Sequence, residues 1–106
     1  MDLERIKFER TGGFAGMRIA ADLELGDLSD EQIRTLVDLL DDLDFAELPE
    51  NLMSDPSASD QFTYTITVEA EEWQHTVVTG DASANEKMQE LLELLNRLAR
   101  NQMRKR

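Results

Sequence analysis

The longest regular pattern in the chain is an alternation of apolar and polar residues between positions 60 and 79. If residues 71–72 form a two-residue turn, Val68 lies opposite His75 and shares its face of the sheet. Ile66 then lies opposite Val77, so the hairpin presents one apolar surface. Because Glu-Glu is an unfavourable pair at such a turn, a register shifted by one residue is the alternative. The apolar side of the first strand is formed by Phe62, Tyr64, Ile66 and Val68.

A second hairpin is predicted near the N-terminus, where residues 3–10 and 14–23 flank Gly12-Gly13. A Gly-Gly pair supplies the positive φ angles that a two-residue hairpin turn requires. The resulting register gives one apolar face, which consists of Ile6 opposite Ile19 and Phe8 opposite Met17.

Phe14 occupies an unusual place in this hairpin, because it falls at the mouth of the turn on the polar face. Arg5, Lys7, Glu9 and Arg18 share that face. One interpretation is a ring that folds over the edge of the sheet, since single exposed hydrophobic residues are common. The other is an apolar anchor for a partner.

Two amphipathic helices are predicted, each of which begins with residues at capping-box spacing. The first runs from Leu28 to Leu43 with Ser29 and Gln32 at its start. The second follows Gly80 and has Ser83 and Glu86 in the corresponding positions. Their apolar stripes consist of Ile33, Leu36, Val37, Leu40 and Leu43, and of Met88, Leu91, Leu92, Leu95, Leu98 and Ala99.

The order of these elements is ββαββα, which predicts an α+β fold. Two helices on one face of a four-stranded antiparallel sheet would bury every apolar face at once. With 106 residues the chain is expected to be a single domain, 1–106, with a basic helix end and tail at 97–106.

Charge is distributed unevenly along the chain, whose formal net charge is −12. Arg34 is the one basic residue between positions 22 and 60, whereas the last ten residues carry five basic side chains and no acid. An acidic surface with a basic helix end that complements the dipole is the simpler interpretation, and a dedicated electrostatic partner site is the alternative. The net charge argues against nucleic-acid binding, which depends on cationic contacts with phosphates.

The absence of cysteine excludes disulfides and thiolate metal sites and favours a reducing compartment. No apolar run reaches the roughly 20 residues of a membrane span, and the first ten residues do not form a signal peptide. We therefore expect a cytoplasmic protein. A monomer is expected, and a dimer seam on the open sheet face, which carries Thr63, Thr65 and Thr67, is the alternative.

Candidate chemistry is sparse, so we expect a binding module and no catalytic residues, metal or cofactor. His75 is the single histidine, and the hairpin register makes it a packed, hydrogen-bonded core residue. An accessible His75 would reopen the case for a small enzyme. Helical geometry would separate the acidic residues that could mimic a cation site, which are Asp38, Asp41, Asp42 and Asp44.

Leu52 and Met53 interrupt an otherwise polar loop that precedes the second hairpin. They either pack back onto the core as an anchor or stay exposed as a binding element.

Four features together resemble the emfourin-like family of small bacterial protease inhibitors. They are GGFAG at Gly12–Gly16, Phe45 with Leu48-Pro49, the strand DQFTYTITVE at Asp60–Glu69, and His75-Thr76-Val77. The similarity runs from about Ile6 to Ala99. The acidic middle of the chain and its basic tail depart from the family pattern.

The resemblance implies an inhibitor of a thermolysin-like or protealysin-like zinc metalloprotease that blocks the protease cleft. Inhibitors present loops from a rigid scaffold, so the turn with Gly12, Gly13 and Phe14 is the first candidate site. Leu52 and Met53 form the second. The alternative function is a non-catalytic acidic adaptor domain, whose binding would weaken steeply with salt.

Overall fold

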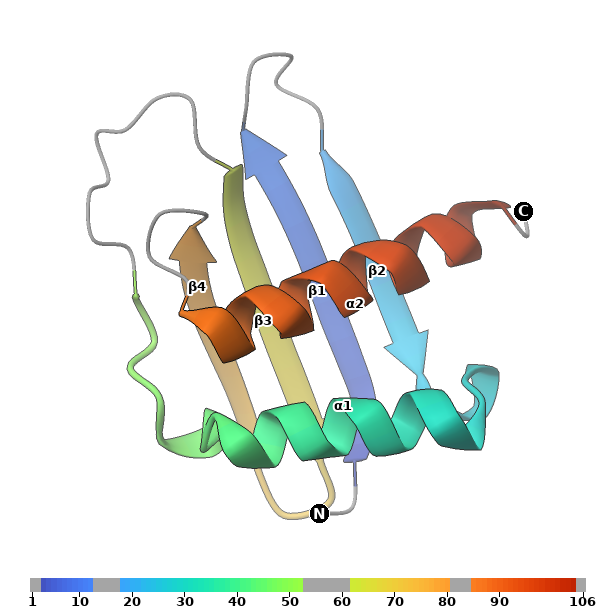
Figure 1. The fold of residues 1–106 in the computed structure, drawn as a ribbon, viewed down its shortest axis with the longest axis horizontal. Coiled ribbons are helices and arrows are strands. Elements are labelled where there is room, and N and C mark those ends of the chain that lie inside the picture. The colour runs from blue at the N-terminus through green and yellow to red at the C-terminus, as the bar shows by residue number, and fades with distance from the viewer. Residues whose placement is uncertain (1–2, 13–17, 53–61, 81–84, 105–106) are drawn as a thin grey trace.

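In the computed structural model, residues 3–12, 18–52, 62–80 and 85–104 are described, and they form a four-stranded antiparallel sheet with two α-helices (Figure 1). The predicted α+β class and the order ββαββα are confirmed. Both helices lie side by side on one face of the sheet. The elements are β1 (Leu3–Gly12), β2 (Ile19–Glu24), α1 (Asp30–Asp42), β3 (Phe62–Ala70), β4 (Gln74–Gly80) and α2 (Glu86–Arg104), with short 3-10 helices at Leu25–Asp27 and Phe45–Glu47.

The strand order is β2-β1-β3-β4, so the first strand of each hairpin lies in the centre of the sheet. β1 and β3 pair along almost their whole length, with Phe8 opposite Ile66 and Gly12 opposite Phe62. This central pairing joins the two hairpins into one sheet.

The predicted register of the second hairpin is confirmed. Val68 pairs with His75 and Ile66 pairs with Val77. The backbone N–H of Ala70 donates to the carbonyl of Trp73 at 2.8 Å, which closes the two-residue turn. The strong alternation of β3 specifies this register because a slip of one residue would turn its apolar side chains out of the core.

The predicted register of the first hairpin is wrong by four residues. Phe8 pairs with Ala21 and Ile6 pairs with Leu23, whereas Ile19 pairs with Arg10. The connection after Gly12 is therefore longer than two residues. A shift by an even number keeps the same residues of β2 on the apolar face, so Ile19 still packs against the core.

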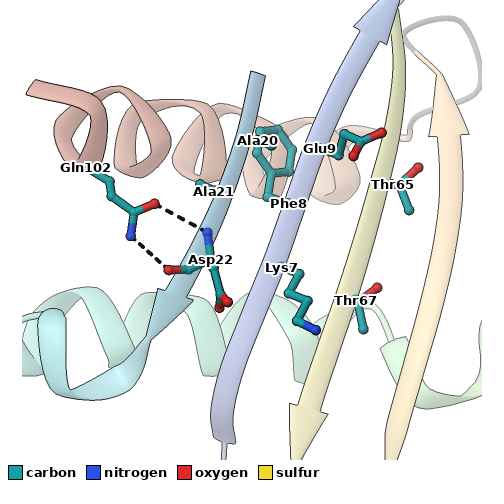
Figure 2. Close-up of a pocket in the computed structure, with 9 residues that line it drawn as sticks. All are labelled: Lys7, Phe8, Glu9, Ala20, Ala21, Asp22, Thr65, Thr67 and Gln102. Atoms are coloured by element: carbon teal, nitrogen blue, oxygen red, sulfur yellow. Dashed lines mark hydrogen bonds between the residues drawn. The ribbon is translucent and has the colours of Figure 1, made fainter. Parts of the chain in front are cut away.

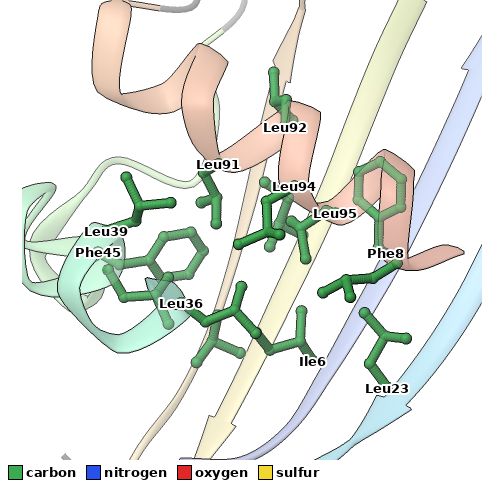
Figure 3. Packing of buried hydrophobic residues seen from close by; sticks show 14 of the residues in the cluster. Ile6, Phe8, Leu23, Leu36, Leu39, Phe45, Leu91, Leu92, Leu94 and Leu95 are labelled. Atoms are coloured by element: carbon green, nitrogen blue, oxygen red, sulfur yellow. The ribbon is translucent and has the colours of Figure 1, made fainter. Parts of the chain in front are cut away.

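The core lies between the sheet and the helices (Figure 3). Leu36 and Leu40 of α1 are completely buried, as are Leu91 and Leu95 of α2. The predicted stripe of α1 is rotated slightly, because Leu39 is buried whereas Ile33 and Val37 are half-buried.

The two helices are capped by side chains that accept backbone N–H groups. Ser29 forms the predicted capping box, in which its Oγ accepts from Gln32 N–H at 3.1 Å and Gln32 Oε1 accepts from Ser29 N–H at 2.9 Å. The predicted cap of the second helix at Ser83 is wrong, since Asn85 Oδ1 accepts the N–H of Met88 at 2.8 Å. Ser83 itself lies outside the described residues, and Asn85 directly precedes α2.

Both edge strands are partly covered by other parts of the chain. At β4, Val78 N–H donates to Glu50 O at 2.8 Å and Val78 O accepts from Leu52 N–H at 2.7 Å. At β2, Gln102 accepts from the N–H of Asp22 at 3.3 Å and donates to its carbonyl at 2.8 Å. Such contacts occupy backbone groups that could otherwise pair with another chain.

No helix within the described residues is long and apolar enough to cross a bilayer.

The packing predicts a large difference between two neighbouring positions of α1. Leu40→Ala should lower the free energy of unfolding by about 2–5 kcal/mol, because it removes a fully buried side chain and leaves a cavity. Asp41→Ala, at an exposed position, should change it by less than about 0.5 kcal/mol. Urea unfolding followed by circular dichroism measures both values, and similar values for the two variants would contradict the described core.

Candidate functional site

The end of β1, the start of β3 and the end of β4 lie at the same end of the sheet (Figure 1). Gly12 at the end of β1 pairs with Phe62 at the start of β3. Gly80 at the end of β4 pairs with Thr63. The chain therefore enters residues 13–17 and 81–84, and returns from residues 53–61, at this one end, which we call the loop end.

Gly12 meets a conformational requirement at the loop end. Its φ is 92°, a value that side chains with a Cβ rarely adopt. A glycine here lets β1 leave the sheet directly after its last pair. Of the first predicted site, Gly12 is thus placed, whereas Gly13 and Phe14 lie outside the described residues.

The second predicted site begins at a fixed point on β4. The N–H of Leu52 donates to Val78 O, and its half-buried side chain packs against the core. This geometry agrees with the anchor interpretation of Leu52. Met53 lies outside the described residues.

Phe62 is held firmly at the loop end by side chains of the sheet. The guanidinium carbon of Arg10 lies 4.5 Å from the centre of the Phe62 ring, which is a cation–π distance. The rings of Phe62 and Tyr64 are 6.3 Å apart. The described part of the loop end therefore has an aromatic base, in which Arg10, Phe62 and Tyr64 contact one another.

His75 is a structural residue on β4. Its Nε2 lies 2.7 Å from the carbonyl oxygen of Leu48, and its ring meets the Phe45 ring edge-on at 5.8 Å between centres. These contacts confirm the expectation of a packed, hydrogen-bonded histidine, but the side chain is half-buried and lies outside the buried core. They connect β4 to the segment that follows α1.

The face of the sheet turned away from the helices carries matched charges. Arg5 contacts Asp22 at 3.1 Å and Glu24 at 2.6 Å. The hydrogen bond with Glu24, aided by the charge of Asp22, raises the pKa of Arg5 above its ordinary value. Two further ion pairs, Lys7 with Glu69 and Arg18 with Glu9, neutralise the other basic side chains described on this face.

A shallow cavity of about 460 Å³ lies over this face between β1, β2 and β3 (Figure 2). Ala20 and Thr65 are short side chains beside the longer Lys7 and Glu9, which leaves the surface hollow. Lys7 pairs with Glu69, and the lining carboxylates of Glu9 and Asp22 pair with Arg18 and Arg5. The cavity therefore has little free charge with which to attract a ligand.

The acidic residues of α1 face solvent in the described structure. Asp38, Asp41 and Asp42 are exposed, and the Asp42 carboxylate lies 3.5 Å from Lys87 of α2. In the part of the chain that is described, no group of three or more His, Cys, Asp or Glu residues could hold a metal ion.

Comparison with family models adds the decisive observation. The Emfourin model matches residues 8–96, a stretch that contains β2, α1, β3 and β4 completely. The chain belongs to the Emfourin family. Membership implies a role as a metalloprotease inhibitor and is consistent with a protein that is not an enzyme. No curated protein and no solved structure matches the chain.

Sequence reasoning overlooked one part of the loop end of this Emfourin protein. A pocket of about 340 Å³ lies between Arg10 and Ile19 of the sheet and Asn96, Arg97 and Arg100 of α2, with Glu93 also in its lining. The basic residues of α2 were visible in the sequence. Their proximity to Arg10, almost ninety positions away, depends on the tertiary fold.

The conformation of Gly12 generates a prediction with an internal control. Gly12→Ala should lower the free energy of unfolding by about 1–2 kcal/mol, because a left-handed conformation is unfavourable for alanine. Gly26→Ala should have little effect or stabilise slightly, since a methyl group there meets no atom within 4 Å. Thermal and urea unfolding of both variants check the difference, and a neutral Gly12→Ala would show that no glycine is needed at that position.

Proposed function

We propose that this protein inhibits a thermolysin-like or protealysin-like zinc metalloprotease by placing segments from its loop end in the protease cleft. The observation that carries the proposal is the convergence of connections at one end of a rigid sheet in a member of the Emfourin family. The bound inhibitor would prevent substrate entry, and the zinc ion would belong to the protease.

The scaffold supports such a mode of binding. Gly12, Phe62 and Gly80 are held by backbone pairing, so the points where the chain leaves and re-enters the sheet are fixed before binding. Fixing these points in advance reduces the conformational entropy lost when a complex forms. The opposite end of the sheet offers less chain for contact with a protease, because a two-residue turn joins β3 to β4 there.

The proposed contacts begin with residues 12–14. Phe14 would be the apolar anchor, and the glycines at positions 12 and 13 would let the backbone approach the cleft closely. Leu52 would fix the start of the second segment on β4, and Met53 would supply its contact. Large apolar side chains are the kind that the family resemblance implies for a thermolysin-like cleft.

Titration of a protealysin-like metalloprotease with the intact protein tests the proposal. We expect peptide hydrolysis to fall in proportion to added protein until the two are equimolar, with the inhibitor uncleaved. The protease encoded nearest to the protein is the preferred target, because inhibitors of this type can be selective. Unchanged hydrolysis by that protease, in the presence of folded protein, would contradict the proposal.

A substitution tests the proposed anchor. Phe14→Ala should raise the inhibition constant by at least about thirtyfold, since central aromatic anchors typically contribute 2 kcal/mol or more to binding. Its circular dichroism spectrum should remain unchanged.

The matched control for Phe14→Ala is Glu72→Ala, an exposed position in the turn at the opposite end of the sheet. It should inhibit as well as the unsubstituted protein. Equal inhibition constants for the Phe14 variant and the control would remove Phe14 from the contact surface.

A further inference from the structure

Three arginines from distant parts of the chain meet beside the loop end. Arg10 comes from β1, whereas Arg97 and Arg100 come from successive turns of α2. Together with Ile19, Glu93 and Asn96 they line the pocket of about 340 Å³. With one carboxylate in the lining, the side chains carry a surplus of positive charge.

The position of this arginine pocket follows from the register of the sheet. Arg10 pairs with Ile19, which is the first residue of β2. Gly12 follows two residues later at the end of β1. The pocket therefore adjoins the points between which residues 13–17 leave and return, on the face of the sheet that carries the helices.

The arginines of the pocket differ from other basic side chains of the protein in that no carboxylate pairs with them among the described residues. Arg5, Lys7, Arg18 and Lys87 each form an ion pair. Within the described residues, none of the three pocket arginines has a carboxylate within ion-pair distance. This is notable in a chain with 23 acidic and 11 basic residues.

Arg10 is held in place by contacts that leave its charge unbalanced. Its guanidinium lies over the Phe62 ring, and its Nη1 donates to Asn96 Oδ1 at 3.3 Å. Its Nε is buried without a hydrogen-bond acceptor among the described residues. A half-buried cation with unsatisfied hydrogen bonding is costly, and a nearby anion would lower that cost.

The negative end of the α2 dipole accounts for part of this arrangement, because arginine is favourable near the end of a helix. The effect falls off within about one turn of the helix end at Arg104, so it reaches Arg100 but neither Arg97 nor Arg10, which belongs to a strand. Binding of an anion would explain why arginines from the strand and from the helix line the same pocket.

We propose that the arginine pocket receives an acidic side chain of the target protease, close to the cleft that the loop end occupies. Planar guanidinium groups suit a carboxylate because each can donate two parallel hydrogen bonds. The rest of the inhibitor is strongly acidic, so a basic pocket at this place would also orient the protein as it approaches. This inference rests on the proposed function.

Charge reversal of Arg97 tests the inference, with Arg34→Glu as the matched control. Both arginines are exposed, lie on helices and lack an ion pair among the described residues, so the two positions are comparable. Each substitution replaces arginine by glutamate and therefore changes the net charge by the same amount. At low salt, Arg97→Glu should raise the dissociation constant of the protease complex about tenfold, mainly through slower association. Arg34→Glu should change it less than twofold.

The salt dependence separates a charge contact from a structural effect. The difference between the variants should shrink towards zero near 1 M salt, where the screening length falls to about 3 Å. Unfolding temperatures identify any loss of stability.

Three outcomes would overturn the inference. Equal losses in the two variants would assign the effect to net charge, and an unchanged Arg97→Glu complex would exclude the pocket while the proposed function stands. Failure of the unsubstituted protein to bind the protease would overturn both proposals.

Discussion

The antiparallel pairing of β1 with β3 is the contact on which the rest of this structure depends. It joins two hairpins that are local in sequence into one sheet, and it brings Gly12 beside Phe62. Apolar and polar residues alternate along both central strands, which places Ile6, Phe8 and Ile66 on the face that the helices cover. Because burial of these side chains and the pairing require each other, a slip in this register would disrupt the core and the loop end together.

The fold separates a stabilising region from a region suited to recognition. Helix packing, the Ser29 cap and the contact of Gln102 with β2 stabilise the scaffold without use of the loop end. The region suited to recognition lies where β1 ends and β3 begins, and the arginine pocket adjoins it. This division is the usual one for proteinaceous binding modules, in which a rigid sheet positions variable segments.

Local sequence patterns predicted those features that depend on neighbouring residues. The register of β3 with β4 followed from strict alternation across a short turn, and the Ser29 cap followed from its spacing with Gln32. The first hairpin was misjudged because Gly12-Gly13 suggests a tight turn, while the energetics favour burial of Leu23 opposite Ile6 through a longer connection. The arginine pocket could not be predicted, since only the packing of α2 across the sheet brings Arg97 to Arg10. The candidate residues Gly13, Phe14 and Met53 lie outside the described structure and stay predictions.

The central claim is that one end of the sheet binds the protease, and amide hydrogen exchange of the inhibitor with and without its target protease tests it most directly. The account predicts additional protection on complex formation at the loop end, around Thr11, Gly12, Phe62 and Gly80. It predicts no change at the opposite end, around Glu72 and Gln74. Protection confined to the β3–β4 turn, or to the exposed face of α1, would contradict the account.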